Sequence, residues 1–183
     1  MLYYFDAGSA KSPVRIPSNV MSTSKITSIE ALSSNVRRLR SEGKRIVFTN
    51  GCFDILHSGH IELFRSARRL GDALVVAINS DRSVHRIKGE KRPIFNEDER
   101  SEILSALEMV DFVTIFGEDT PLRTILEIRP DVLVKGADWE EKGIVGQEEV
   151  EAWGGQVVPI RLVEGRSTSG IIDRIVSLAR PDD

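Results

Sequence analysis

Two histidines stand three residues apart in the segment Asn50–His60, where a helix is expected to begin. One helical turn places His57 and His60 on the same face of that helix. A helix N-terminus has N–H groups without helical partners and a partial positive charge, so it attracts anions. Gly59, between the two histidines, would let a phosphate group approach the backbone closely. These residues predict a site that binds an anion such as a phosphate group.

Other interpretations of this segment remain. Histidine pairs with this spacing also occur as surface or capping residues. A zinc site would need further nitrogen or sulfur ligands, and only His85 and Cys52 are candidates. The thiol of Cys52, near a helix start, could have a lowered pKa. We favour the alternative that Cys52 is a small buried residue in a turn.

A basic stretch is the second candidate. Between Arg82 and Arg92, five basic residues and one acidic residue occur in a chain whose formal net charge is −3. This local excess of positive charge predicts a mobile lid over anionic substrates, to which Lys88 and Arg92 would bind. For Arg82 and Arg86 we favour the alternative that they form the solvated face of a short helix.

The elements that position these residues alternate along the chain. The apolar segments 46–49, 73–79, 112–116, 132–135 and 156–160 predict strands. Helical spacing and capping residues predict helices at about 29–39, 58–70, 96–108, from 120 onward, 147–152 and 169–179. The alternation predicts a fold of the α/β class: a single Rossmann-like, doubly wound domain with a parallel five-stranded sheet and helices on both faces.

Ligands of such sheets bind beyond the carboxyl ends of the strands. Four polar or glycine-rich segments are therefore expected to form the site: 50–60, 79–92, 135–139 and 161–170. In the last segment, Ser167 and Thr168 precede the final helix. Their hydroxyl and N–H groups could bind phosphate, cap the helix, or do both.

The first 43 residues differ in charge from the rest. They hold six basic and three acidic side chains, so a basic appendage precedes an acidic domain at 44–180. Residues 1–25 show no periodicity and predict a flexible tail. The sequence 27–30 fits a capping box. It opens a helix within 26–43 that either lies on the domain or acts as a linker.

Composition excludes several classes of protein. Of the 183 residues, 40% are hydrophobic and 29% are charged, which is typical of a soluble globular protein. The net charge argues against non-specific nucleic-acid binding, and no apolar run approaches the roughly 20 residues that span a bilayer. A single cysteine, Cys52, excludes an intrachain disulfide and a cysteine-based zinc cage. We expect a cytoplasmic protein with neither a nucleic-acid nor a membrane partner.

The motifs together resemble a known superfamily. The segment 51–60, with its His-x-Gly-His core, resembles the nucleotidyltransferases related to class I aminoacyl-tRNA synthetases, and 166–171 is similar to their second motif. The segments 49–54, 79–81, 88–93 and 133–138 most resemble the heptose 1-phosphate nucleotidyltransferase branch. This resemblance covers residues 44–178, nearly the whole predicted domain.

The resemblance implies that a sugar phosphate oxygen attacks the α-phosphorus of a nucleoside triphosphate and releases pyrophosphate. ATP is the favoured donor over GTP or CTP, Mg²⁺ accompanies the nucleotide, and the product is an activated heptose for surface lipopolysaccharide. A separate sugar kinase would supply the acceptor, and a homodimer is expected by analogy. The alternatives are a glycerol 3-phosphate cytidylyltransferase, which the pair Asp138-Trp139 keeps open, and a non-catalytic nucleotide-binding module.

Pattern and resemblance together assign the site residues. Those expected to be catalytic are His57, His60, Lys88, Ser167 and Thr168. Those expected to bind the nucleotide are Asn50, Gly51, Cys52, Phe53, Asp54, Gly59, Asn79, Arg92, Arg100, Lys135, Gly136, Asp138 and Arg166. Asp54 either reaches a metal or holds the turn. Arg100 either points toward the nucleotide or forms a surface ion pair. No metal bound by the protein itself is expected.

Overall fold

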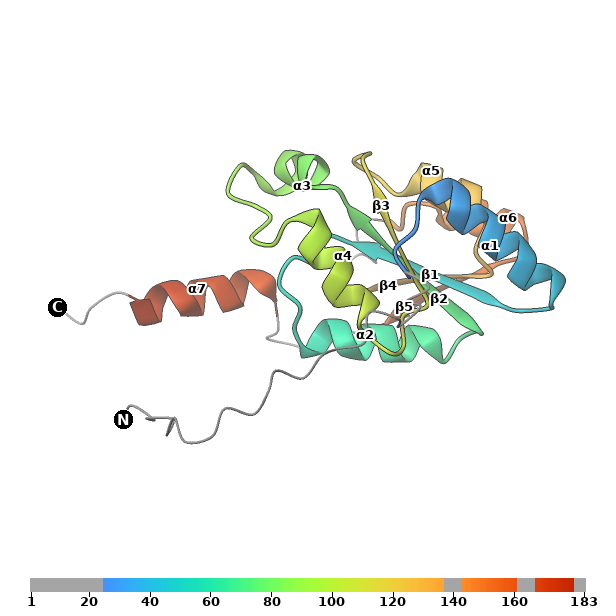
Figure 1. Cartoon of the computed structure of the whole chain (residues 1–183), viewed down its shortest axis with the longest axis horizontal. Helices are drawn as coiled ribbons and strands as arrows, with labels where there is room; N and C mark the ends of the chain where they lie inside the picture. Colours follow the sequence, from blue (N-terminus) through green and yellow to red (C-terminus); the bar gives the residue numbers. More distant parts are fainter. Residues whose placement is uncertain (1–24, 137–142, 161–166, 180–183) are drawn as a thin grey trace, which may run out of the picture.

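The sheet of this protein has five parallel strands in the order β3-β2-β1-β4-β5 (Figure 1). The structure, a computed structural model, describes residues 25–136, 143–160 and 167–179. The strands are β1 (Ile46–Gly51), β2 (Ala73–Asn79), β3 (Phe112–Phe116), β4 (Val132–Gly136) and β5 (Gln156–Ile160). All five predicted strands are confirmed, and β1 and β4 continue slightly beyond the predicted ends. β1 is central, because Phe48 pairs with Val75 of β2 and with Leu133 of β4.

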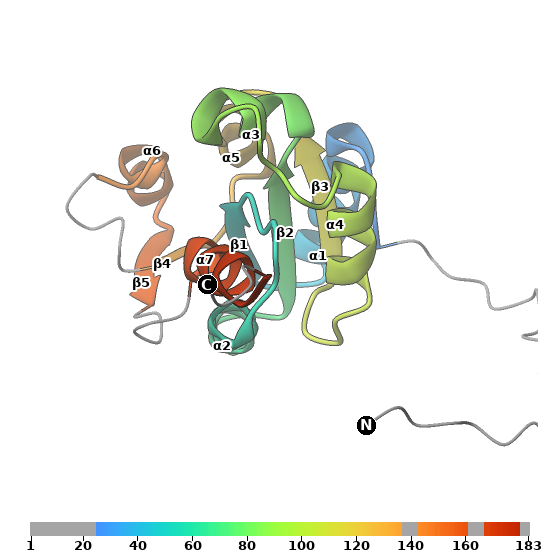
Figure 2. The same cartoon turned by 90° about the vertical axis from the view of Figure 1, so that its left-hand side faces the viewer.

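Helices cover both faces of the sheet, which confirms the predicted fold class (Figures 1 and 2). One face is covered by α1 (Ile29–Ser41), α5 (Leu122–Ile128) and α6 (Gln147–Ala152), and the other by α2 (Ser58–Arg68) and α4 (Glu97–Ser105). The remaining helices are α3 (Asp81–Lys88) and α7 (Thr168–Ala179). None of the described helices is long and apolar enough to cross a lipid bilayer.

Strand side chains alternate between two cores. Val47 packs with the α2 and α4 side, whereas Ile46 and Phe48 pack with the α1, α5 and α6 side. All seven residues of β2 are buried. A strand covered on both faces needs an almost continuous apolar run, and this is why the sequence identified β2 so clearly.

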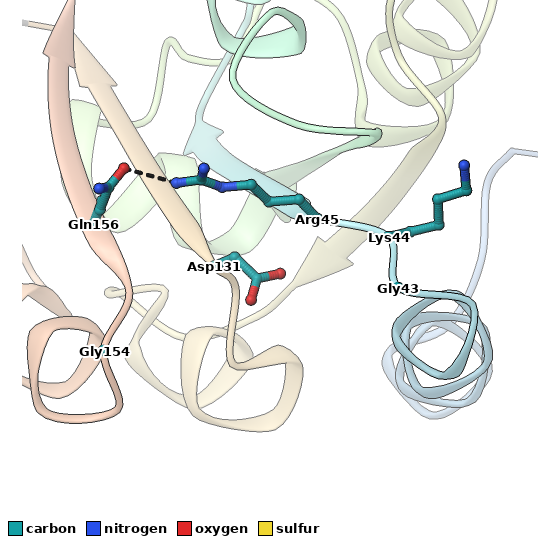
Figure 3. A pocket seen from close by; sticks show the side chains of 6 residues that line it. All are labelled: Gly43, Lys44, Arg45, Asp131, Gly154 and Gln156. Atoms are coloured by element: carbon teal, nitrogen blue, oxygen red, sulfur yellow. Dashed lines mark hydrogen bonds between the residues drawn. The ribbon is translucent and has the colours of Figure 1, made fainter.

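Aspartates secure the amino ends of the strands, opposite the edge where ligands are expected. Asp72 accepts a hydrogen bond from the N–H of Arg45, and Asp131 accepts one from the N–H of Ile46, each at 2.8 Å. A shallow hollow of about 280 Å³ lies here, and Figure 3 shows the Arg45 guanidinium donating to Gln156 (2.7 Å) beside it. Its polar groups hold strand ends together, so we assign this hollow a structural role.

The helix α1 lies on the domain, which is the first of the two alternatives predicted for it. Its Leu32 and Val36 are buried in the core, and Ile26 forms a parallel bridge with Val113 of β3. The predicted capping box is wrong, because the helix begins one residue later. Ser28 is the N-cap and accepts from the N–H of Ala31 (3.3 Å). Of the predicted tail at 1–25, residues 1–24 lie outside the described part of the chain. Lys25 is bonded to the domain, because its carbonyl accepts from the N–H of Val113 (2.9 Å).

The basic stretch is partly a packed helix. Ser80 caps α3, and Ser83 and Val84 on one side of this helix are buried. Arg82 and Arg86 lie on its exposed side, so the short-helix alternative is confirmed for both. The helices predicted from apolar spacing did not include 81–88, because only Val84 and Ile87 of these eight residues are apolar. Only the alternative favoured for Arg82 and Arg86 placed a short helix here. The helix start predicted near residue 96 is confirmed, because Asn96 is the N-cap of α4 and forms a capping box with Glu99.

Candidate active site

A pocket of about 560 Å³ opens at the carboxyl edge of the sheet, at the neighbouring strands β1 and β4. From β1 the chain adds β2 and β3 on one side of the sheet, and it then crosses to add β4 and β5 on the other side. This is the topological switch point, at which doubly wound sheets bind ligands. Its walls come from the loop after β1, the first turn of α2, the end of α3, the β3–α5 loop and the start of α7. Figure 2, in which α7 is seen end-on, shows how these segments gather at one edge.

Most of the predicted site residues line this pocket. They are Asn50, Gly51, Cys52, Phe53, Asp54, His57, His60, Asn79, Lys88, Arg92, Lys135, Gly136, Ser167 and Thr168. Gly59 is buried within α2 and is not on the pocket wall. Asp138 and Arg166 lie outside the described residues.

The two histidines stack at the start of α2. Their ring centroids are 3.8 Å apart with an interplanar angle of 24°, and the N–H of His60 donates to the carbonyl of His57 (2.9 Å). Burial, with a smaller contribution from His57, lowers the pKa of His60 to about 4. At neutral pH His60 is therefore an uncharged imidazole. It suits hydrogen bonding to an anion rather than permanent charge neutralisation.

Phe53 orients the His60 ring. The edge of His60 meets the Phe53 ring at a centroid distance of 5.2 Å, and Phe53 in turn packs on Phe64 at 5.0 Å. The φ of Phe53 is 44°, a left-handed conformation that few non-glycine residues adopt. A Cβ on Gly51 would lie only 3.1 Å from this ring. Glycine at 51 therefore lets Phe53 pack here without a shift of its ring.

Asp54 holds a turn. Its side chain is nearly fully buried and accepts hydrogen bonds from the Arg92 guanidinium (2.6 Å) and from the N–H groups of Ile94 (2.7 Å) and Phe95 (3.0 Å). Of the two roles considered for Asp54, the structure shows the turn-holding one. Arg92 lines the pocket, but its charge is already paired with Asp54.

The sequence-based prediction for Arg100 is wrong. Neither alternative holds, because its side chain is completely buried and does not reach the pocket wall. Its guanidinium donates to the carbonyls of Phe95, Cys52 and Asn79 at 2.7–3.0 Å and to the Asp81 carboxylate at 2.7 Å. Arg100 therefore ties the loop after β1 to the end of β2 and to the start of α3.

The floor of the pocket carries a buried cation and an unpaired acceptor. Lys135, at the end of β4, is only 7% exposed, and its Nζ lies 3.4 Å from the carbonyl of Asn50. The buried Oδ1 of Asn50 has no hydrogen-bond donor within the described part of the chain. The floor thus has a positive charge at the pocket wall and, beneath the surface, an acceptor that no described donor satisfies.

Ser167 and Thr168 join α7 to the histidine segment. Ser167 accepts a hydrogen bond from the N–H of Gly170 (3.0 Å), so it caps the helix as one of the alternatives expected. The Thr168 hydroxyl donates to the carbonyl of Ile55 (3.2 Å), just before the histidines. The starts of α2 and α7 are therefore held side by side, and anion-binding helix ends of this kind converge on one place.

Comparison of this chain with known protein families, sequences and structures agrees with this geometry. Residues 48–163 match the family model described as cytidylyltransferase-like. The chain belongs to this family. The bifunctional protein HldE of Citrifermentans bemidjiense is 54% identical over 156 residues, which are 85% of this chain and 32% of that protein. HldE of Geobacter metallireducens is 50% identical over 155 residues, again 85% and 32% of the two chains.

This cytidylyltransferase-like chain spans about a third of the length of those curated relatives. A solved structure, the lipopolysaccharide core biosynthesis protein from Thermoplasma volcanium, is 33% identical with a TM-score of 0.55. The likeness covers 68% of this chain and all of that one. The resemblance identified from the His-x-Gly-His segment is confirmed.

Several pocket residues were not predicted. Asp119, Thr120 and Pro121 follow β3, and Ile144 and Val145 precede α6. The rule that ligands bind beyond strand ends could have identified 119–121, because the preceding strand was predicted correctly. Ile144 and Val145 follow no strand directly and carry no local pattern that marks them.

The Cys52 thiol is expected to react slowly in the folded protein. Burial raises its pKa, so the lowered-pKa alternative is wrong and little thiolate exists near pH 7.5. We expect alkylation by iodoacetamide at pH 7.5 to be at least about tenfold slower than in the same protein unfolded in urea. Mass spectrometry over time measures both rates. Equal rates would contradict the burial of this thiol.

Proposed function

We propose that this cytidylyltransferase-like protein transfers a nucleoside monophosphate, AMP by preference, to D-glycero-D-manno-heptose 1-phosphate. Pyrophosphate is released, and the nucleotide-activated heptose serves surface polysaccharide synthesis. The observation that carries the proposal is the stacked His57–His60 pair, which faces the start of α7 across the switch-point pocket. The identity to HldE proteins and the likeness to a lipopolysaccharide core biosynthesis protein support the choice of acceptor.

The proposed chemistry is a displacement at phosphorus. An oxygen of the acceptor phosphate forms a bond to the α-phosphorus, and the bond from that phosphorus to the bridging oxygen breaks. Pyrophosphate leaves with the electron pair. An acceptor phosphate is largely ionised at neutral pH, so no general base is needed. Alignment and charge stabilisation then supply the rate enhancement.

The pocket offers groups for both tasks. His57 and His60 would donate hydrogen bonds to phosphate oxygens, and the ammonium groups of Lys88 and Lys135 would neutralise negative charge. A bound triphosphate would itself raise the pKa of His60 from its value of about 4, because the negative charge favours the imidazolium.

Mg²⁺ would enter as part of the nucleotide substrate. Among the described residues, no three His, Cys, Asp or Glu side chains gather in a way that could hold a metal ion. Both carboxylate oxygens of Asp54 already accept hydrogen bonds. We therefore propose that phosphate oxygens and water supply the ligands of the ion.

The partners follow from the proposed substrates. A sugar kinase acting separately from this domain would supply the 1-phosphate. The relatives are called bifunctional, and the matched region is about a third of their length. We also propose a homodimer and a cytoplasmic location. The competing acceptor, glycerol 3-phosphate with CTP, drew its support from Asp138-Trp139, which lie outside the described residues.

Pyrophosphate release tests the function. The protein is incubated with Mg²⁺, with each of the four common nucleoside triphosphates, and with either anomer of heptose 1-phosphate or with glycerol 3-phosphate. We expect release with ATP and one heptose 1-phosphate anomer, and little with glycerol 3-phosphate. Release only with CTP and glycerol 3-phosphate would favour the competing function. Release from no combination would contradict nucleotidyl transfer altogether.

A further inference from the structure

We propose that Asp119 and Thr120, with Lys88, form the acceptor subsite of this pocket and select a polyhydroxylated sugar phosphate. This inference rests on the proposed function and adds the residues that recognise the sugar. Asp119, Thr120 and Lys88 all lie outside the histidine segment 50–60, so the two ends of the pocket can be tested separately.

The pocket has two chemically different ends. His57, His60 and Thr168 come from the starts of α2 and α7, and α2 packs on one face of the sheet. Asp119 and Thr120 come from the loop before α5, which packs on the opposite face. The triphosphate is suited to the histidine end, because the imidazoles and the starts of two helices offer donors to several phosphate groups. The Asp119 end is therefore left for the second substrate.

The carboxylate of Asp119 is held in place with one oxygen available. Arg86 Nε donates to Asp119 Oδ1 at 2.6 Å, and Arg86 Nη2 donates to the carbonyl of Gly117 at 2.7 Å. Within the described residues, Oδ2 takes part in no hydrogen bond or ion pair, and the side chain is 62% exposed. An oriented carboxylate oxygen at a pocket wall accepts hydrogen bonds well from sugar hydroxyls.

The loop that carries Asp119 is fixed by buried contacts. The Ser83 hydroxyl donates to the carbonyl of Glu118 (2.8 Å), and the amide of Asn79 donates to Ser83 (3.0 Å). Asn79 itself lines the pocket. Because the loop is already ordered, binding there costs less conformational entropy. The arrangement is typical of a subsite that discriminates between ligands.

The surrounding side chains match a sugar phosphate. Ile87 and Val145 expose 47% and 37% of their surface and, with Ile144, offer apolar contacts to the C–H groups of a sugar. Lys88 has no ion-pair partner among the described residues and supplies a cation for the phosphate. A carboxylate, a hydroxyl, an ammonium and an apolar wall together suit a phosphorylated polyol better than a nucleobase.

Steady-state kinetics of D119N and T120V test the subsite. Hydrogen bonds to a charged group contribute about 1.5–3 kcal/mol, so D119N is expected to raise the KM for heptose 1-phosphate about 10- to 100-fold. The KM for ATP should stay within about twofold. T120V removes a neutral hydrogen bond and should raise the acceptor KM about fivefold.

The matched control is E118Q. Glu118 is the neighbouring carboxylate, pairs with Arg123 at 3.1 Å and is not on the pocket wall, so both KM values should be unchanged. If D119N raised the KM for ATP instead, the nucleotide would occupy this end and the inference would be wrong. An unchanged acceptor KM would also overturn it. If the wild type transferred nothing, the proposed function would fail, and calorimetric titration of heptose 1-phosphate into wild type and D119N would then decide the subsite.

Discussion

Replacing either His57 or His60 by alanine is expected to lower kcat about 10²- to 10³-fold, while the KM for ATP changes less than about fivefold. Loss of one donor aimed at developing negative charge typically costs this much in turnover. The two rings stack at 3.8 Å, so removing one also frees the other to move. The two effects are therefore expected to be less than additive in the double variant.

Two further variants make this prediction specific. His85, the third histidine, is exposed on α3 and outside the pocket, so H85A should keep the wild-type kcat. H60Q retains an N–H donor and should recover part of the turnover that H60A loses. The His57 side chain makes no capping hydrogen bond to α2, and a melting curve of H57A checks that the variant is folded before its turnover is compared. Wild-type turnover in both alanine variants would exclude the histidine pair from catalysis.

The framework of this fold could be predicted because local sequence determines it. β2 and β3 have the predicted bounds, since a strand buried on both faces requires a run such as Ala73–Asn79. The place of the site followed from the framework, because parallel strands bring their carboxyl ends to one edge. That reasoning alone gathered His57, Lys135 and Ser167 into one pocket from three distant segments.

Side-chain pairing between distant segments could not be predicted in this way. Asp54 meets the N–H of Ile94, 40 residues away, and Arg100 meets the carbonyl of Cys52, 48 residues away. Spacing along the chain says nothing about such pairs, since they depend on how loops cross at the sheet edge. The place of Asp119 beyond β3 could have been predicted from the strand-end rule, but its pairing with Arg86 of α3 could not.

Replacing Arg100 by methionine is expected to lower the free energy of unfolding by about 3–5 kcal/mol. Methionine keeps much of the volume but leaves the Asp81 carboxylate and the carbonyls of Phe95, Cys52 and Asn79 without their donor. Buried acceptors that lose a partner bear the full cost of desolvation. Urea unfolding followed by circular dichroism measures the change.

Two comparisons separate this burial effect from a general loss of charge. R123M removes an exposed arginine whose ion pair with Glu118 lies at the surface, and it should cost less than about 1 kcal/mol. R100K keeps the charge, but an ammonium cannot reproduce the planar fork that reaches four acceptors, so it should restore only part of the stability. A loss below about 1 kcal/mol in R100M would mean that water replaces the guanidinium. The stated loss would instead show that the fold around the loop after β1, which leads to the histidines, depends on a buried residue outside the pocket wall.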